Sequence, residues 1–126
     1  MSRIDVLGVG FDDLTMDGAV EAALGFMASR AARYVCTPNP EIVMAAKKDG
    51  GLASALAGAD MVLADGVGVT KAAAMLGTPL KSRVPVIDFA AAVISRLAAR
   101  GGSVYLFGAK PGVAEAAAEK LSAQYQ

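Results

Sequence analysis

The sequence predicts an α/β fold of the Rossmann-like kind, with a mostly parallel sheet and helices on both of its faces. Short apolar runs rich in β-branched residues alternate with longer segments whose apolar residues recur at helical spacing. Parallel strands need crossover helices, and strands buried on both faces read as continuous apolar runs. A chain of 126 residues with 55% hydrophobic content can bury one core, so we expect a single α/β domain over residues 1–126.

Four strands are expected where short apolar runs end in turn residues. They cover residues 4–9, 34–36, 61–64 and 103–107. Helical spacing predicts helices over residues 16–29, 40–48, 52–59, 66–76, 87–100 and 113–125. The pattern stops at residue 126 without a glycine, proline or other C-terminal helix signal, so we expect the fold to be truncated at its C-terminus.

Composition excludes several classes of protein. The charges of twelve basic and twelve acidic residues cancel, which argues against binding of nucleic acid through an overall positive charge. The absence of histidine and the single cysteine exclude a His/Cys metal site, a Ser-His-Asp triad and an internal disulfide. Without a signal peptide, and with no run near the ~20 apolar residues of a membrane span, the chain is expected to be cytoplasmic.

Polar residues follow two of the predicted strands. Residues 37–41 read Thr-Pro-Asn-Pro-Glu, in which the prolines stiffen the turn, and residues 65–68 read Asp-Gly-Val-Gly. In open α/β sheets, ligands lie beyond the carboxyl ends of the strands. We therefore expect Thr37, Asn39 and Asp65 to face one pocket.

Each of these polar residues also has a purely structural interpretation. Asn39 suits an N-cap of the helix that follows it, a role compatible with substrate contact, and Thr37 suits a turn. Glu41 lies in a first helical turn, where the helix dipole favours a carboxylate, and this is the stronger interpretation for that residue. Asp65 follows an apolar strand, so partial burial would suit it to act as a general base; capping the next helix is an equal alternative.

Three further places suit phosphate groups. Gly66 and Gly68 allow close backbone approach at a helix start, whose free N–H groups suit a diphosphate. Residues 108–112 read Gly-Ala-Lys-Pro-Gly between a predicted strand and a helix, a weak signal because glycine also serves simply to reverse the chain. Arg83 precedes another helix and suits a phosphate, although a solvated loop charge is the commoner explanation.

Three motifs in this order resemble the WecG/TagA/CpsF family of bacterial glycosyltransferases. They are Thr-Pro-Asn-Pro-Glu-Ile-Val at residues 37–43, Asp-Gly-Val-Gly-Val at 65–69 and Arg-Val-Pro at 83–85. Ile-Asp-Val-Leu-Gly-Val at residues 4–9 and Tyr-Leu-Phe-Gly-Ala at 105–109 add to the match. The resemblance covers essentially the whole chain.

The resemblance implies an inverting glycosyltransferase that moves N-acetylmannosamine, or a related sugar, from a UDP-sugar to a polyprenyl-diphosphate-linked sugar. Such reactions build wall teichoic acid and other surface polysaccharides. By analogy Asp65 takes the proton from the acceptor hydroxyl, Thr37 and Asn39 position the sugars, and Arg83 stabilises charge on the diphosphate. The scheme requires no metal or other cofactor.

The same analogy assigns the remaining positions. Glu41 and Gly66 would bind substrate, and Gly108 and Ala109 would bind the nucleotide. Val86 stands where the family usually has glycine after Arg-Val-Pro, so we expect a different turn beside Arg83.

Family members are longer than this chain. Their C-terminal part supplies nucleotide contacts and an appendage that associates with the membrane, so we expect contact with the inner face of the cell membrane only through that part. Pairing of subunits into a homo-oligomer is left open. A non-catalytic module that binds nucleotide-sugars is the main alternative function, and a glycoside hydrolase using Asp65 and Glu41 is a remote one.

Overall fold

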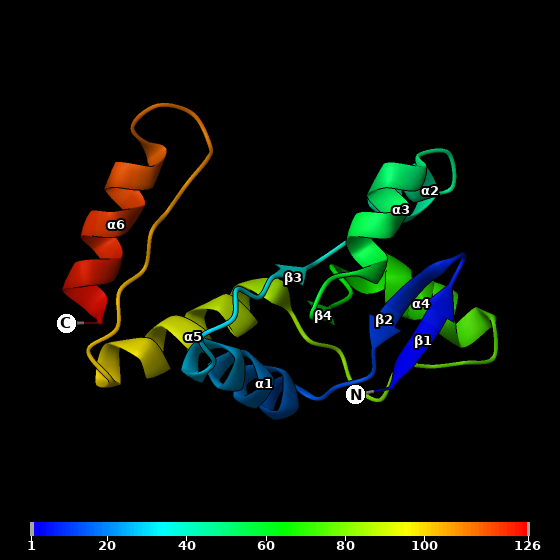
Figure 1. Cartoon of the computed structure of the whole chain (residues 1–126), viewed down its shortest axis with the longest axis horizontal. Helices are drawn as coiled ribbons and strands as arrows, with labels where there is room; N and C mark the ends of the chain where they lie inside the picture. Colours follow the sequence, from blue (N-terminus) through cyan, green and yellow to red (C-terminus); the bar gives the residue numbers. More distant parts are fainter. Residues whose placement is uncertain (1, 126) are drawn as a thin grey trace. The chain divides into compact units, whose positions relative to one another are not determined.

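The computed structural model describes residues 2–125 and shows a mixed α/β fold (Figure 1). Its elements are β1 Arg3–Val6, β2 Val9–Asp12, α1 Met16–Ala28, β3 Val35–Cys36, α2 Pro40–Ala46, α3 Gly50–Ala57, β4 Met61–Val62, α4 Val67–Met75, α5 Val86–Ala99 and α6 Val113–Gln124. The chain divides into two compact units, Met1–Phe89 and Ala90–Gln126. The prediction of a single domain over residues 1–126 stays a prediction.

The first two strands form a hairpin, where one strand was expected over residues 4–9. β1 and β2 pair antiparallel, with Val6 opposite Val9. Leu7 and Gly8 make the turn between them, and both have positive φ, 52° and 95°, as a type I′ hairpin turn requires. The prediction of a single strand was wrong. Leucine rarely adopts a left-handed conformation, so the sequence contains no indication of a turn at Leu7.

The second sheet is a parallel pair. β3 and β4 align Val35 with Met61 and Cys36 with Val62. At the start of the pair, the N–H of Asp60 donates to the carbonyl oxygen of Tyr34 at 3.0 Å. The two strands therefore run side by side and end at the same edge, as predicted for the second and third strands.

The larger parallel sheet is not among the described elements, which form two two-stranded sheets. Within residues 2–125, the segment 103–107 has no backbone hydrogen bond to another segment and is not a strand. A strand is defined by its ladder, and an apolar run without a neighbouring strand cannot form one. The strand expected at 103–107 is therefore wrong for this structure, whereas the α/β class is confirmed.

The hairpin lies at the centre of the first unit's core. Phe11 is completely buried in β2, α3 packs on β2, α4 packs on β1, and β2 lies beside β4. The core cluster consists of Val6, Val9, Phe11, Val43, Ala46, Leu56, Ala59, Val62, Val69 and Ala73. Burial of this apolar surface holds the two sheets and three of the helices together.

A partly buried ion pair between Arg3 and Asp12 connects the hairpin to its neighbours. Asp12 is 5% exposed, and its carboxylate accepts from the N–H of Val62 at 2.8 Å and from Arg3 Nε at 3.2 Å. The Arg3 guanidinium also donates to the carbonyl oxygens of Ala57 and Ala59. These bonds compensate the desolvation of the carboxylate and connect the hairpin to β4 and to the end of α3.

Side-chain caps mark the starts of α1, α2 and α3. Thr15 Oγ1 accepts from the N–H of Gly18 at 3.1 Å, and α1 begins at Met16, the predicted start. Asp49 Oδ1 accepts from the N–H of Leu52 at 3.1 Å, so α3 begins at Gly50, two residues before the predicted start. The pair of glycines at 50–51 therefore starts a helix, because the Asp49 cap outweighs their low helix propensity.

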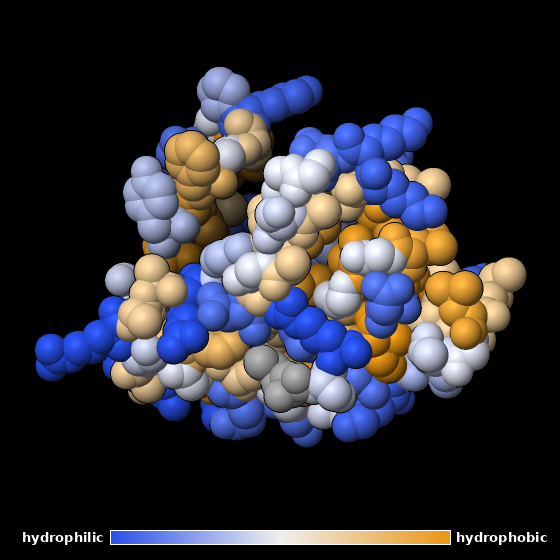
Figure 2. Space-filling view, turned by 45° about the vertical axis from the view of Figure 1, so that its right-hand side comes forward, coloured by the Kyte–Doolittle hydropathy of each residue, from blue (hydrophilic) through white to orange (hydrophobic). Residues whose placement is uncertain are grey.

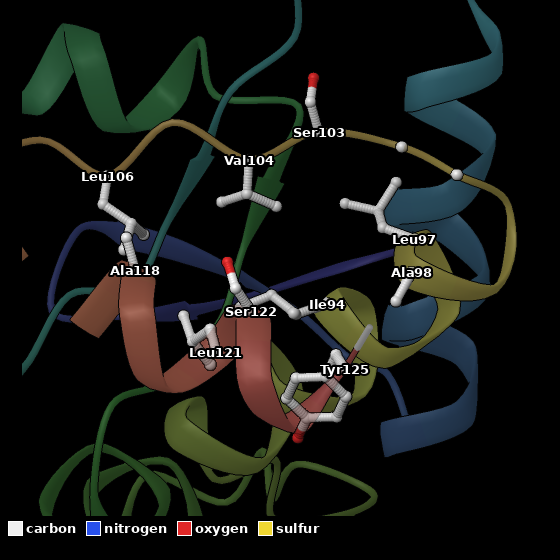
Figure 3. A pocket seen from close by; sticks show the side chains of 12 residues that line it. Ile94, Leu97, Ala98, Ser103, Val104, Leu106, Ala118, Leu121, Ser122 and Tyr125 are labelled. Atoms are coloured by element: carbon white, nitrogen blue, oxygen red, sulfur yellow. The ribbon is translucent and has the colours of Figure 1, made fainter. Parts of the chain in front are cut away.

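The second unit contains the later part of α5, an extended connection and α6. Figure 3 shows Val104 and Leu106 pointing from the connection toward α6. Leu121 of α6 and Tyr125, which follows the helix, line the same cavity of about 410 Å³. The other lining residues are Ile94, Leu97, Ala98, Gly101, Gly102, Ser103, Ala118 and Ser122. The lining is mainly apolar, as expected for a helix face against an apolar segment.

Apolar side chains also reach the surface, where Figure 2 shows them as orange areas among hydrophilic residues. In the second unit Tyr105 is 87% exposed and Phe107 is 91% exposed. None of the helices in residues 2–125 is long and apolar enough to cross a bilayer.

Candidate functional site

The polar segments that follow β3 and β4 lie side by side. Beyond the paired strands, the N–H of Leu63 donates to the carbonyl oxygen of Cys36 at 2.9 Å, and the N–H of Asp65 donates to that of Pro38 at 3.2 Å. These bonds continue the parallel register past the last residues of the strands, and in that register Asn39 stands opposite Asp65. The structure thus brings the two segments together; a shared substrate pocket stays a prediction.

The helices that follow these segments begin in direct contact. A Cβ added to Gly68, in the first turn of α4, would lie 2.7 Å from Cγ of Pro40, the first residue of α2. Carbon atoms do not approach that closely, so glycine is required for the observed spacing. Two helix N-termini therefore adjoin the same polar edge, and both dipoles favour negative charge there.

Asn39 caps α2, which confirms its structural interpretation. Its Oδ1 accepts from the N–H of Ile42 at 2.9 Å, and Pro40 occupies the first helical position. The cap engages the oxygen of the side-chain amide. No partner for its Nδ2 group is present among residues 2–125. The amide nitrogen thus remains able to donate to a sugar hydroxyl while the oxygen holds the helix.

Asp65 does not cap α4. The N-cap is Gly66, with φ of 82°, and α4 has no side-chain cap bond. Asp65 is half-buried, and within the described part of the chain its carboxylate has no hydrogen bond or ion pair. The capping alternative is therefore wrong for Asp65, and its carboxylate is available to accept a proton.

The other predicted residues of the first unit differ in exposure. Thr37 is half-buried at the end of β3, and Glu41 is exposed in the first turn of α2. Arg83 is exposed in the loop between α4 and α5. Its guanidinium has no partner among the residues that the structure describes. All three side chains can therefore take a ligand.

Gly108 and Ala109 belong to the second unit. Both have positive φ, 118° and 64°, so the chain does turn sharply there. Because they lie outside the first unit, their relation to Asp65 stays a prediction.

One contact near the site has no counterpart in the sequence predictions. Asp13 Oδ1 accepts from the backbone N–H of Lys81 at 2.6 Å, joining the residue after β2 to the loop that carries Arg83. The signal available in the sequence was the adjacent pair Asp12 and Asp13 after an apolar run. Two adjacent aspartates are not a motif that binds a metal ion and a diphosphate. The hydrogen bond to the loop joins residues too far apart in the sequence to be predicted from motif spacing. Residues 2–125 contain no cluster of three or more acidic or cysteine side chains suited to a metal ion.

Comparison with known proteins agrees with the motif order. Residues 4–126 match the model of the family described as "Glycosyl transferase WecG/TagA/CpsF family". The chain belongs to the WecG/TagA/CpsF family of glycosyltransferases. The match covers both compact units of the chain, and it confirms the resemblance based on residues 37–43, 65–69 and 83–85.

Similar curated proteins come from Staphylococcus aureus. In strains NCTC 8325 / PS 47, COL and MW2, a protein named N-acetylglucosaminyldiphosphoundecaprenol N-acetyl-beta-D-mannosaminyltransferase is 34% identical to this chain over 126 residues. In each case the alignment covers 98% of this chain and 50% of the relative. The chain therefore spans about half the length of these relatives.

Proposed function

We propose that this chain is the N-terminal catalytic part of an inverting glycosyltransferase. It transfers N-acetylmannosamine, or a related sugar, from a UDP-sugar to a polyprenyl-diphosphate-linked sugar during synthesis of teichoic acid or another surface polysaccharide. The S. aureus relatives are named for a mannosaminyl transfer to N-acetylglucosaminyl-diphosphoundecaprenol. The observation that carries the proposal is the bond from Asp65 N–H to the Pro38 carbonyl, which sets an unpaired carboxylate beside the segment of Thr37 and Asn39.

Asp65 supplies the base for a single displacement. As the acceptor hydroxyl oxygen attacks the anomeric carbon, its proton passes to the Asp65 carboxylate. The new glycosidic bond forms while the bond from that carbon to the UDP oxygen breaks, and UDP leaves with the electron pair. Attack opposite the leaving group inverts the anomeric centre. General base catalysis of this kind contributes about 10²- to 10⁴-fold in rate.

The surrounding groups bind and orient the reactants. The Thr37 hydroxyl and the free Nδ2 of Asn39 hold sugar hydroxyls. Arg83 offsets negative charge on the diphosphate as it departs, and preorganised charge of this kind acts most strongly in the transition state. The uncapped N-terminus of α4 at Gly66 adds backbone donors to the diphosphate, and Glu41 contacts a sugar at the rim.

The remaining assignments extend beyond the first unit. Gly108 and Ala109 bind the nucleotide, and the parallel pair of β3 and β4 belongs to a larger Rossmann-like parallel sheet in the whole protein. The parallel register of β3 and β4 supports the second assignment, since parallel strands are joined by crossover helices and occur in sheets covered on both faces. The whole protein acts in the cytoplasm at the inner face of the cell membrane, which it contacts through its C-terminal part.

The test is acceptor-dependent release of UDP. UDP-N-acetylmannosamine is incubated with the natural gene product that contains this chain, with and without a polyprenyl-diphosphate-linked N-acetylglucosamine. We expect UDP release and a new disaccharide-lipid when the acceptor is present. No release with any UDP-N-acetylhexosamine would overturn the proposal.

A nucleotide-sugar binding module is the second candidate, favoured by the chain's coverage of half of its relatives. Calorimetry of the 126-residue chain with UDP separates the two functions. Heat of binding without turnover by the natural gene product supports the binding module. Absence of heat at millimolar UDP counts against it.

A further inference from the structure

Asp13 fastens the loop that carries Arg83. Its Oδ1 accepts from the backbone N–H of Lys81 at 2.6 Å, across 68 positions of sequence. Among the described residues, this is the only hydrogen bond that ties the backbone of residues 79–84 to a distant part of the chain. Charge-assisted bonds of this type are roughly twice as strong as neutral ones.

The anchor itself is well fixed. The N–H of Asp13 donates to the carbonyl oxygen of Ser2 at 3.1 Å, which extends the hairpin pairing by one bond. The preceding residue, Asp12, is buried and bonded to both Arg3 and Val62. Asp13 therefore projects from the most firmly held end of the hairpin, next to β4, whose exit carries Asp65.

Packing alone leaves the loop partly free. Leu80 packs against the core cluster and Val84 is 7% exposed, whereas Lys81 and Arg83 are exposed. Between the two apolar anchors the chain is held by the Asp13 bond at Lys81, two residues before Arg83. Removing that bond frees a stretch of three residues whose end residue is the proposed partner of the diphosphate.

We propose that Asp13 is a positioning residue for Arg83, and through it for the diphosphate of the UDP-sugar. This role rests on the proposed function, since it assigns Asp13 an effect only where Arg83 binds the donor. In this role Asp13 contacts no substrate itself. It fixes the position of the loop backbone at Lys81 relative to the end of β4. Misplacement of a binding group by about 1 Å can lower the rate by up to about 10²-fold.

The first experiment compares variants of Asp13 in the natural gene product. Asp13→Ala removes the acceptor for Lys81 N–H, whereas Asp13→Asn keeps an oxygen in the same place. We expect Asp13→Ala to lower kcat/KM for UDP-N-acetylmannosamine by about tenfold, mainly through a higher KM. Asp13→Asn should restore kcat/KM to within about threefold of wild type, because the acceptor oxygen remains.

Asp5→Ala is the matched control. Asp5 also accepts a backbone N–H within the hairpin, that of Gly8 at 3.4 Å, but at the opposite end from the loop. The variant should retain wild-type kcat/KM. Equal losses in Asp5→Ala and Asp13→Ala would overturn the positioning role, because they would point to general loosening of the hairpin.

A double-mutant cycle distinguishes positioning from stability. If Asp13 acts through Arg83, Asp13→Ala should lower kcat/KM little further in an Arg83→Ala background. Independent losses that multiply would overturn the inference. Limited trypsin digestion provides a readout without activity, since cleavage after Lys81 or Arg83 should accelerate in Asp13→Ala and stay unchanged in Asp5→Ala.

The outcomes separate the inference from the function on which it rests. A wild-type protein without UDP release overturns the proposed function and the positioning role together. Normal UDP release with wild-type kinetics in Asp13→Ala overturns the positioning role alone. Unchanged trypsin cleavage in Asp13→Ala shows that the loop needs no anchor and counts against the inference.

Discussion

The amide N–H of Asp65 donates a hydrogen bond to the carbonyl oxygen of Pro38 at 3.2 Å. Pro38 has no N–H of its own, but its carbonyl is free to accept, so the parallel alignment of β3 and β4 continues through a proline. The bond fixes Asp65 beside the turn that bears Thr37 and Asn39. Asp65 therefore keeps its place only while the two segments and the helices that follow them stay in contact.

Replacing Gly68 with alanine should separate the starts of α2 and α4. The new methyl group would stand 2.7 Å from Cγ of Pro40, a ring atom that cannot rotate away. We expect a loss of about 1–3 kcal/mol in the free energy of unfolding, as for other overpacked sites. Urea unfolding measures the stability, and kcat/KM for UDP release should fall as the two polar segments move apart.

Gly25→Ala serves as the control for Gly68→Ala. Gly25 lies inside α1, and a Cβ there meets no atom within 4 Å. Alanine in a helix interior is favoured by about 1 kcal/mol over glycine, so this variant should be at least as stable as wild type and equally active. A Gly68→Ala protein as stable as Gly25→Ala would contradict the close contact of the two helices.

Asn39 should have two separable roles. Asn39→Ala removes the cap from Ile42 N–H and should cost about 1 kcal/mol of stability together with activity. Asn39→Ser keeps a capping oxygen but lacks Nδ2, so it should retain stability while kcat/KM falls. Parallel thermal unfolding and kinetics test this; full activity in Asn39→Ser would limit Asn39 to capping.

Arg3→Met should weaken the first unit without touching the site. The change removes the bonds to Asp12, Ala57 and Ala59 and leaves the buried Asp12 carboxylate without its ion-pair partner. The carboxylate keeps its hydrogen bond from the N–H of Val62, so we expect the loss of its charged partner to cost about 1–3 kcal/mol. Chemical denaturation should show the loss of stability. A change below about 0.5 kcal/mol, as is usual for surface substitutions, would contradict a structural role for this ion pair.

Asp60 should make the stability of the parallel pair depend on pH. The N–H of Tyr34 donates to its carboxylate at 2.9 Å and Arg33 pairs with it at 3.1 Å, which together hold the pKa of Asp60 below its ordinary value. Because the folded state favours the charged form, this stabilisation is complete above the unfolded pKa of about 3.9 and is lost as pH falls through the folded pKa.

The pH effect is measured against Asp60→Asn. Urea midpoints of the two proteins should differ by a constant amount between about pH 5 and 8, with wild type the more stable, and should converge below about pH 4. A difference that persists unchanged to about pH 2 would mean that the Asp60 charge contributes nothing to the stability of this pair.

The sequence predicted the structure most accurately where a rule about neighbouring residues applied. Asn39 before Pro40 combines a cap with a favoured first helical residue, and the helix began there. The end of β3 at Cys36 also followed from an apolar run that gives way to polar residues, whereas β4 ends at Val62, two residues before the predicted end of that strand. The family motifs include the polar residues that follow these strands, so the motif and the strand pattern both predict Asp65 as a site residue.

Other features depended on contacts that no local pattern encodes. Leu7 adopts a left-handed conformation because hairpin pairing on either side compensates for it, so one predicted strand became two. Residues 103–107 have the composition of a buried strand, but a ladder needs a neighbour, and composition does not supply one. The Asp13 bond to Lys81 joins segments far apart in sequence, where spacing carries no information.

The role of Asp65 as the base is tested most directly by kcat for UDP-N-acetylmannosamine transfer by the Asp65→Asn variant of the natural gene product. Asparagine keeps the shape and the backbone bond to Pro38 but cannot accept the proton. We predict a fall in kcat of at least about 10²-fold with KM nearly unchanged, because a missing base acts on the transition state alone. A kcat equal to that of wild type would contradict the assignment of Asp65 as the base.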